Sequence, residues 1–166
     1  MKTLTSILIL LTLVISLPSH SQEAVTGVAD PESLFVDKDP VLNRNKQAAL
    51  HIVRELLQCN QWNRAGEWLT ERYIQHNPNA KSGRDGVVYF FTQVLKLKPT
   101  ENCGKLKTPI VAVMAEDDYV TVLYARSLPD PRSPGKTYTT TWFDTWRFVD
   151  GKADEHWDPA EIITPK

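Results

Sequence analysis

The segment "FDTWRFVDGKADEHWDP", residues 143–159, alternates aromatic and polar residues on both sides of an Asp-Gly pair. This pattern is typical of two antiparallel strands joined by a tight turn. The same segment holds five acidic residues and one histidine. It therefore predicts a β-hairpin that also carries a dense group of ionisable side chains.

The register of this hairpin decides which side chains can meet, because a shift of one residue moves every side chain to the other face. A two-residue loop, Asp150-Gly151, pairs Thr145 with His156 and turns Asp144 to the opposite face. A three-residue loop ending at Gly151 pairs Asp144 with His156 instead. The second register is favoured, since glycine suits the positive φ of a type I turn followed by a bulge. Both registers stay open at this stage.

In the three-residue register a carboxylate and an imidazole lie opposite each other on a face with two indoles, Trp142 and Trp146. Cross-strand neighbours have Cβ atoms about 5 Å apart, close enough for their side chains to hydrogen-bond. Asp158, opposite Trp142, could take a proton from carbon beside a carbonyl while His156 or a water serves the oxygen. Asp158, His156 and Asp144 are thus the candidate catalytic residues.

A simpler interpretation assigns these residues no catalytic role. Asp144 then pairs with Arg147 or a solvent cation, and His156 is an ordinary edge residue.

Hydrophobic spacing predicts three helices before the hairpin. Asp39 followed by Pro40 is a typical helix start, and the apolar face that follows extends to about Gln58. Shorter helical patterns cover residues 60–71 and 82–98, with a short extended segment between them at 72–78. From residue 108 the period changes to two, as in strands. The order predicts an α+β domain whose helices pack on one face of a curved, mainly antiparallel sheet.

The N-terminus has the three-part pattern of a secretory signal, with cleavage expected after Ser21. Residues 22–37 show no sustained period and are expected to form a flexible lead-in. The domain is expected over 38–160, followed by a tail at 161–166. These features predict a secreted or periplasmic protein with no stable membrane insertion after cleavage.

Cys59 and Cys103 are the only cysteines. An oxidising compartment makes a disulfide reasonable, but two free thiols remain the alternative. Two cysteines alone form no structural zinc site, and no metal is expected.

Other classes of function find little support in the sequence. The chain is close to neutral, with a formal charge of −1, which argues against a nucleic-acid surface. No glycine-rich phosphate loop, HExxH pair or Gly-x-Ser-x-Gly elbow is present. A cofactor is therefore not expected, and the expected partner is a small apolar molecule.

Three segments together resemble the SnoaL-like polyketide cyclase group of the nuclear-transport-factor-2-like superfamily. They are "RYIQHNP" (72–78), "GRDGVVYFF" (83–91) and "WRFVDGKADEHWD" (146–158). They occur in the family's order and at similar spacing, so the resemblance covers the chain from about Asn43 to Pro159.

This resemblance implies a cone, in which a strongly bent sheet is wrapped by three helices around an apolar pocket. It implies that Asp158 is a general acid/base, as in an intramolecular aldol closure. A histidine of the cyclases corresponds to Asp144 here, and that departure leaves His156 as the possible proton donor. The segment 72–78 offers Tyr73 and His76 as ligand-binding residues beside Trp142 and Trp146.

The leading hypothesis is an exported, cofactor-independent acid/base enzyme, a cyclase, isomerase or dehydratase that acts on a small apolar carbonyl compound. The alternatives are a ligand-binding module without turnover and an interaction domain. The family also implies a homodimer formed through the sheet, with Trp157 as a candidate for its surface.

Overall fold

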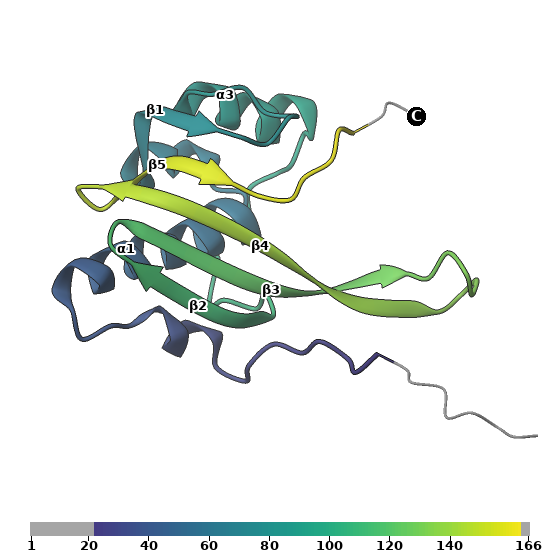
Figure 1. The fold of residues 1–166 in the computed structure, drawn as a ribbon. Helices are drawn as coiled ribbons and strands as arrows, with labels where there is room; N and C mark the ends of the chain where they lie inside the picture. Colours follow the sequence, from purple (N-terminus) through teal and green to yellow (C-terminus); the bar gives the residue numbers. More distant parts are fainter. Residues whose placement is uncertain (1–21, 164–166) are drawn as a thin grey trace, which may run out of the picture.

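Five strands form one mixed sheet in the order β1-β5-β4-β3-β2 (Figure 1). This computed structural model describes residues 22–163. Only β1 and β5 are parallel, and the other neighbours are antiparallel. The strands are β1 Leu69–Gln75, β2 Ile110–Glu116, β3 Tyr119–Pro129, β4 Thr137–Val149 and β5 Lys152–Trp157. The predicted α+β class and the mainly antiparallel sheet are confirmed.

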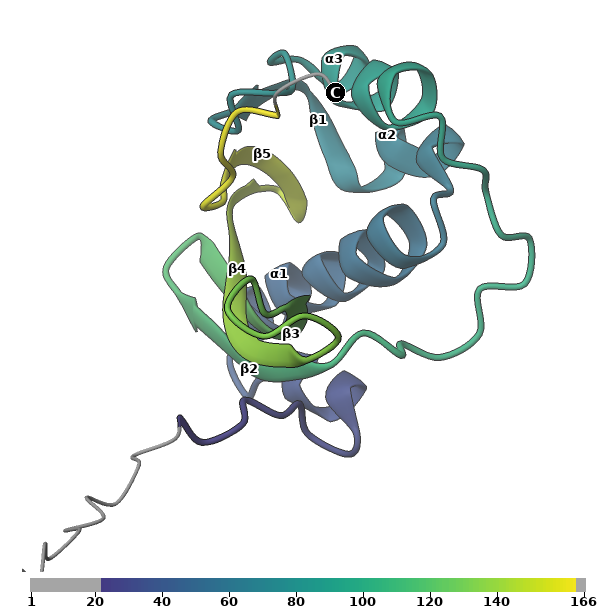
Figure 2. The same ribbon diagram turned by 90° about the vertical axis from the view of Figure 1, so that its right-hand side faces the viewer.

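Three helical segments cover the concave face of this sheet (Figure 2). The first is α1, Pro40–His51, which continues as π-helical turns to Gln58 (η2, Ile52–Gln58). Its start is as predicted, because the Asp39 carboxylate accepts hydrogen bonds from the first free backbone N–H groups.

The other two helical segments are shorter than the sequence pattern predicts. A 3₁₀ turn (η3, Trp62–Arg64) leads into α2, Ala65–Trp68, which ends where β1 begins. The third segment is α3, Arg84–Tyr89, followed by η4, Phe90–Val94. The predicted helix over 60–71 is too long, because residues from Leu69 pair with β5 instead.

The core lies between the helices and the concave face of the sheet. Its largest fully buried side chains come from helices and strands alike, namely Trp146, Phe35, Leu56, Leu69, Ile110, Val53, Val87, Val120 and Val122. Such burial contributes about 25 cal/mol for each Å² of apolar surface removed from water. Both layers are thus held by one shared core.

The segment before α1 is packed against the domain, so the prediction of a flexible lead-in at 22–37 is wrong for much of its length. A 3₁₀ turn (η1, Pro31–Phe35) places Phe35 in the core with no exposed surface. The backbone N–H of Val28 donates to the carbonyl of Ile110 in β2, at 2.8 Å. The sequence pattern missed this packing because it depends on one aromatic anchor and not on a periodic face.

The β4–β5 hairpin has a two-residue turn, so the favoured three-residue loop is wrong. Asp150 and Gly151 both have positive φ, 49° and 78°, as a type I′ turn requires. Asp154 then forms a bulge. Beyond it Trp146 pairs with His156, which agrees with neither of the two registers predicted from the sequence. Asp144 still lies on the face of His156, as its diagonal neighbour across the hairpin.

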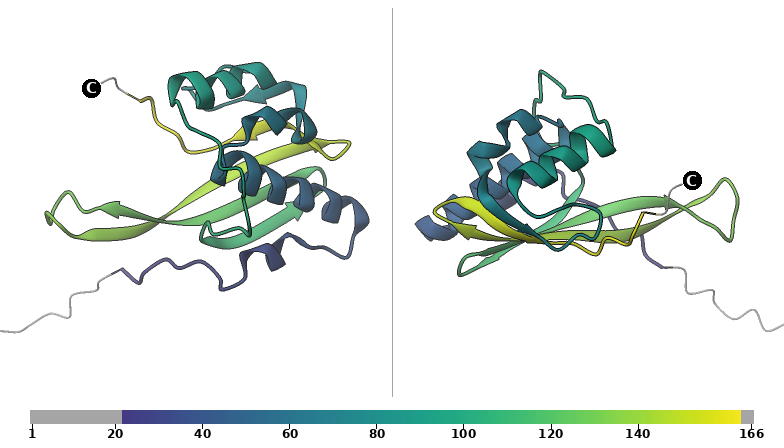
Figure 3. Two further views of the ribbon diagram at one scale, coloured as in Figure 1. Left: turned by 180° about the vertical axis from the view of Figure 1, so that it is seen from behind. Right: turned by 90° about the horizontal axis from the view of Figure 1, so that it is seen from above.

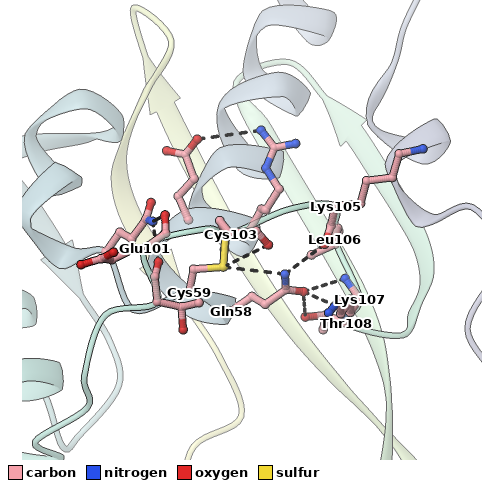
Figure 4. The surroundings of a disulfide bond; sticks show 12 residues. Gln58, Cys59, Glu101, Cys103, Lys105, Leu106, Lys107 and Thr108 are labelled. Carbon is pink, nitrogen blue, oxygen red and sulfur yellow. Dashed lines mark hydrogen bonds and ion pairs between the residues drawn. A yellow bond between two sulfur atoms is a disulfide. The ribbon is translucent and has the colours of Figure 1, made fainter.

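Cys59 and Cys103 form a disulfide with their Cα atoms 5.6 Å apart (Figure 4). The bond joins the end of the first helix to the long loop between η4 and β2. Beside it, the Gln58 side chain accepts from the backbone N–H of Lys107 and donates to the carbonyl of Lys105. The loop is therefore held to the helix by a covalent bond and by hydrogen bonds.

The N-terminal hydrophobic run, predicted to be a signal peptide at 1–21, lies outside the described residues. Within residues 22–163, no helix is both long and apolar enough to cross a bilayer.

Candidate functional site

A cavity of about 740 Å³ lies between the helices and the concave face of the sheet. Its polar groups come mainly from β1, β3, β4, β5 and the residues just after β1 and β5. Most of its wall is apolar, made of Ile52, Leu56, Leu57, Trp62, Leu69, Val87, Phe90, Phe91, Leu95, Trp142 and Trp146. An apolar cavity with a few convergent polar groups is the usual form of a small-molecule site.

Asp144 and His156 form a buried pair in this wall. Asp144 is 7% exposed and His156 is 6% exposed. The His156 Nε2 atom lies 3.2 Å from Asp144 Oδ1. The indole Nε1 of Trp142 donates to the same carboxylate oxygen at 3.3 Å. Asp144 does not pair with Arg147, whose guanidinium binds Asp154 and Glu155 instead.

The contact of the second ring nitrogen of His156, Nδ1, shows where the hydrogen of a neutral His156 must lie. His156 Nδ1 lies 2.7 Å from Gln75 Oε1, which also accepts the backbone N–H of Asn77 at 3.1 Å. Because that backbone group is a donor, the Gln75 atom is the amide oxygen, and Nδ1 must carry a hydrogen to bond with it. A neutral His156 would then point the Nε2 lone pair at a carboxylate. The contact with Asp144 is a hydrogen bond only when the pair holds one additional proton.

Asp158 lies just beyond β5 and completes the group. Its Oδ2 accepts from the Asn77 side chain at 2.8 Å, and its Oδ1 accepts from the backbone N–H of Ala160 at 3.0 Å. One ligand atom from each of Asp144, His156 and Asp158 lies within 4.8 Å of the others. The three predicted catalytic side chains therefore meet in the wall of the cavity.

These three side chains also form the only group in residues 22–163 that could surround a metal ion. An Nδ1–H held by an amide oxygen is the usual orienting contact of a metal-binding imidazole. However, Nε2 faces Asp144, and it offers no lone pair to an ion when the pair holds the additional proton. The geometry fits a shared proton better than a metal.

Two tyrosine hydroxyls lie in the same wall. Burial raises the pKa of Tyr73 far above its usual value, and the nearby Asp144 and Asp158 charges act in the same direction. Its oxygen accepts from the indole of Trp146 at 3.2 Å, which leaves its own hydrogen to donate. Burial likewise raises the pKa of the Tyr124 hydroxyl, and the neighbouring Asp144 carboxylate acts in the same direction. Both hydroxyls stay neutral at physiological pH.

His76 does not line the cavity, so its prediction as a ligand-binding residue is wrong. Tyr73 and Gln75 face the cavity from β1, and the next alternation sends His76 to the other side of the sheet. There its Nε2 lies 2.9 Å from Glu155 Oε1 and its ring stacks on Trp157. Of the predicted ligand-binding residues, Tyr73, Trp142 and Trp146 do line the cavity.

The predicted site lacked several polar residues of the cavity, among them Gln75, Asn77, Tyr124 and Arg126. The alternation of β1 and β3 was a usable signal for Gln75 and Tyr124, since each is two residues from another inward-facing side chain. Arg126 is likewise two residues from Tyr124 in β3, whereas Asn77 lies beyond the end of β1, where strand alternation no longer applies.

Comparison with known proteins identifies the family. The family model described as "SnoaL-like domain" matches residues 52–156. No curated protein is significantly similar to the chain in sequence.

Solved structures share the fold. A proposed SnoaL-like polyketide cyclase from Jannaschia sp. CCS1 is 18% identical with a TM-score of 0.52, covering 74% of this chain and 90% of that one. A nuclear-transport-factor-2-like protein of unknown function from Burkholderia pseudomallei K96243 is 17% identical with a TM-score of 0.51, covering 71% and 91%. At these identities the likeness concerns the fold alone.

Proposed function

The chain belongs to the SnoaL-like domain family, with a nuclear-transport-factor-2-like fold, and on that premise we propose that it is an acid/base enzyme. Its substrate is a small, largely apolar carbonyl compound, and no cofactor takes part. The observation that carries the proposal is the meeting of the Asp158 carboxylate with the buried His156–Asp144 pair in the wall of an apolar cavity.

Asp158 is the base in this reaction. It takes a proton from the carbon next to the carbonyl, the C–H electron pair moves into the new C=C bond, and negative charge develops on the carbonyl oxygen. The hydrogen bonds from Asn77 and Ala160 hold the Asp158 carboxylate in place. Positioned proton transfer of this kind contributes about 10²–10⁴-fold to a rate.

The developing oxygen charge is met by a neutral donor and by a nearby cationic group. The Tyr73 hydroxyl has a free hydrogen for this oxygen, whereas both ring N–H groups of a doubly protonated His156 are directed at Gln75 and Asp144. Donors aimed at the place where charge develops are the largest catalytic contribution in many enzymes. Tyr73 thus supplies the hydrogen-bond donor that Asp144 cannot, and His156 adds positive charge nearby when it is doubly protonated. Ring closure, isomerisation and dehydration all begin with the same proton abstraction.

The test of this proposal needs no natural substrate. Purified protein is incubated in D₂O with 2-tetralone, and deuterium at the carbons next to the carbonyl is followed by NMR. We expect exchange well above that of the buffer and of the denatured protein. Binding of 2-tetralone without added exchange would leave a ligand-binding module as the function.

Gln75 is a positioning residue in this scheme, and its replacement should have a measurable signature. Gln75→Leu removes the acceptor of His156 Nδ1–H, so we expect deuterium exchange to slow about tenfold or more. Gln75→Glu retains an acceptor and should restore much of the rate. The ¹⁵N NMR signals of the His156 ring report the cause directly. Unchanged ring signals in Gln75→Leu would contradict the role.

Export is part of the proposal, and the Cys59–Cys103 bond supports it. Disulfides persist in oxidising compartments and are rare in the reducing cytosol. The enzyme would then act on a compound outside the cytoplasm.

A homodimer through the outer face of the sheet is also part of the proposal. Phe143 and Met114 lie on this face, opposite the cavity, and are 41% and 54% exposed. We expect sedimentation of the wild type as a dimer and of Phe143→Glu as a monomer, because burying the new charge is costly. Val41→Glu, at a 50% exposed position of α1, is the control. A monomeric wild type would contradict the dimer.

A further inference from the structure

Arg126 is a cationic side chain in the wall of the cavity that the proposed mechanism does not use. It lies near the far end of β3, opposite Thr140 of β4. Beyond this point the two strands project from the rest of the sheet as a ribbon (Figures 1 and 3). Arg126 is exposed, so it stands where the cavity opens to solvent.

The guanidinium of Arg126 is held in place by an aromatic ring. Its Cζ atom lies 4.6 Å from the centroid of the Trp142 ring, within the range of a cation–π interaction. The Nε1 edge of the same indole donates to Asp144. Trp142 therefore connects the cation at the opening with the catalytic pair.

Arg126 has no carboxylate partner in the part of the chain that the structure describes. Other arginines differ in this respect, since Arg147 binds Asp154 and Glu155, and Arg132 binds Asp130. A guanidinium has five N–H donors and matches a carboxylate with two parallel hydrogen bonds. Stacking on Trp142 leaves those donors, which lie in the plane of the group, available.

The Asp144 and Asp158 carboxylates form no ion pair with Arg126 and have partners of their own. Asp144 is opposite Val122, four residues from Arg126 along β3. The Asp144 charge is met by His156, and Asp158 accepts two hydrogen bonds. Glu161 also borders the cavity but is exposed to solvent. An anion that enters the cavity would therefore contact the Arg126 guanidinium before it reaches the Asp144 or Asp158 carboxylate.

We propose that Arg126 binds a carboxylate on the outer end of the substrate, whose carbonyl end reaches Asp158 and His156. The substrate class is then an aromatic or fused-ring keto acid and not a neutral ketone. This inference rests on the proposed function for the position of the reacting end. The carboxylate site itself depends only on Arg126, Trp142 and the cavity.

The test compares two probes that differ only in the carboxylate, 2-acetonaphthone and 6-acetyl-2-naphthoic acid, by calorimetry at neutral pH. We expect the acid to bind the wild type about fivefold tighter than the neutral ketone. Arg126→Gln should remove this preference while leaving the affinity for the ketone unchanged. Arg132→Gln, at the tip of the same ribbon, is the matched control and should keep the preference. Added salt should weaken the binding of the acid only.

Equal affinities in the wild type, a preference that survives in Arg126→Gln, or binding of neither probe would overturn the inference. Repeating the titrations with Asp158→Asn separates it from the proposed function. A preference for the acid without any deuterium exchange would mean that Arg126 serves a binding module. Exchange without a preference would mean that the enzyme takes neutral ketones.

Discussion

Asp158→Asn should reduce the deuterium exchange of 2-tetralone by about 10²–10⁴-fold, the usual contribution of a positioned general base. The amide cannot accept the proton, yet its oxygen can still receive a hydrogen bond from Asn77 or Ala160, which hold the carboxylate in the native protein. The variant should therefore fold and still bind the ketone. The rate is measured by NMR and binding by calorimetry.

Asp117→Asn is the matched control for this experiment. Asp117 lies in the turn between β2 and β3, has a φ of 51° and does not line the cavity. Asparagine tolerates this left-handed backbone, so the control should exchange at the wild-type rate. Exchange that persists in Asp158→Asn, with the control unchanged, would show that another group is the base.

Removing the disulfide should produce the largest change in stability. Cys59 and Cys103 are separated by 44 residues, and closing a loop of that length stabilises the folded state by about 4 kcal/mol, mainly by restricting the unfolded chain. The double variant Cys59→Ser with Cys103→Ser should lose about that much free energy of unfolding in urea. Its Tm should fall by on the order of 10–20 °C.

Reduction provides the control for the serine variant. Dithiothreitol should shift the unfolding midpoint of the wild type toward that of the double variant and leave the variant itself unchanged. A loss below about 1 kcal/mol would mean that the hydrogen bonds of Gln58 to the loop, and not the covalent bond, account for its attachment.

Much of the architecture could be predicted from local patterns. The start of α1 follows from Asp39 and Pro40, because an N-cap and a proline at the first turn act on neighbouring backbone groups only. The alternation of β4 places Trp142, Asp144 and Trp146 on one face whatever their partners are. The change from a helical period to a period of two likewise predicted the α+β class.

Contacts between distant segments were not predictable in the same way. The bulge at Asp154 changes the hairpin register. The Asp154 carboxylate accepts hydrogen bonds from Thr70 of β1 and Arg147 of β4. Phe35 anchors the lead-in because its ring is fully buried in the core. Neither feature leaves a periodic trace in the sequence.

The sequence by itself determined which residues can do chemistry and which face of each strand they occupy, since alternation along a strand is a local property. It predicted Asp158, His156 and Asp144 as a group. Only the tertiary structure decided that Gln75 accepts a hydrogen bond from His156 Nδ1, that His76 lies outside the cavity and that Arg126 lies at its opening. Those positions depend on the pairing of β1 with β5 and on how far β3 extends past the cavity. Both are set by contacts between residues that are distant in the sequence.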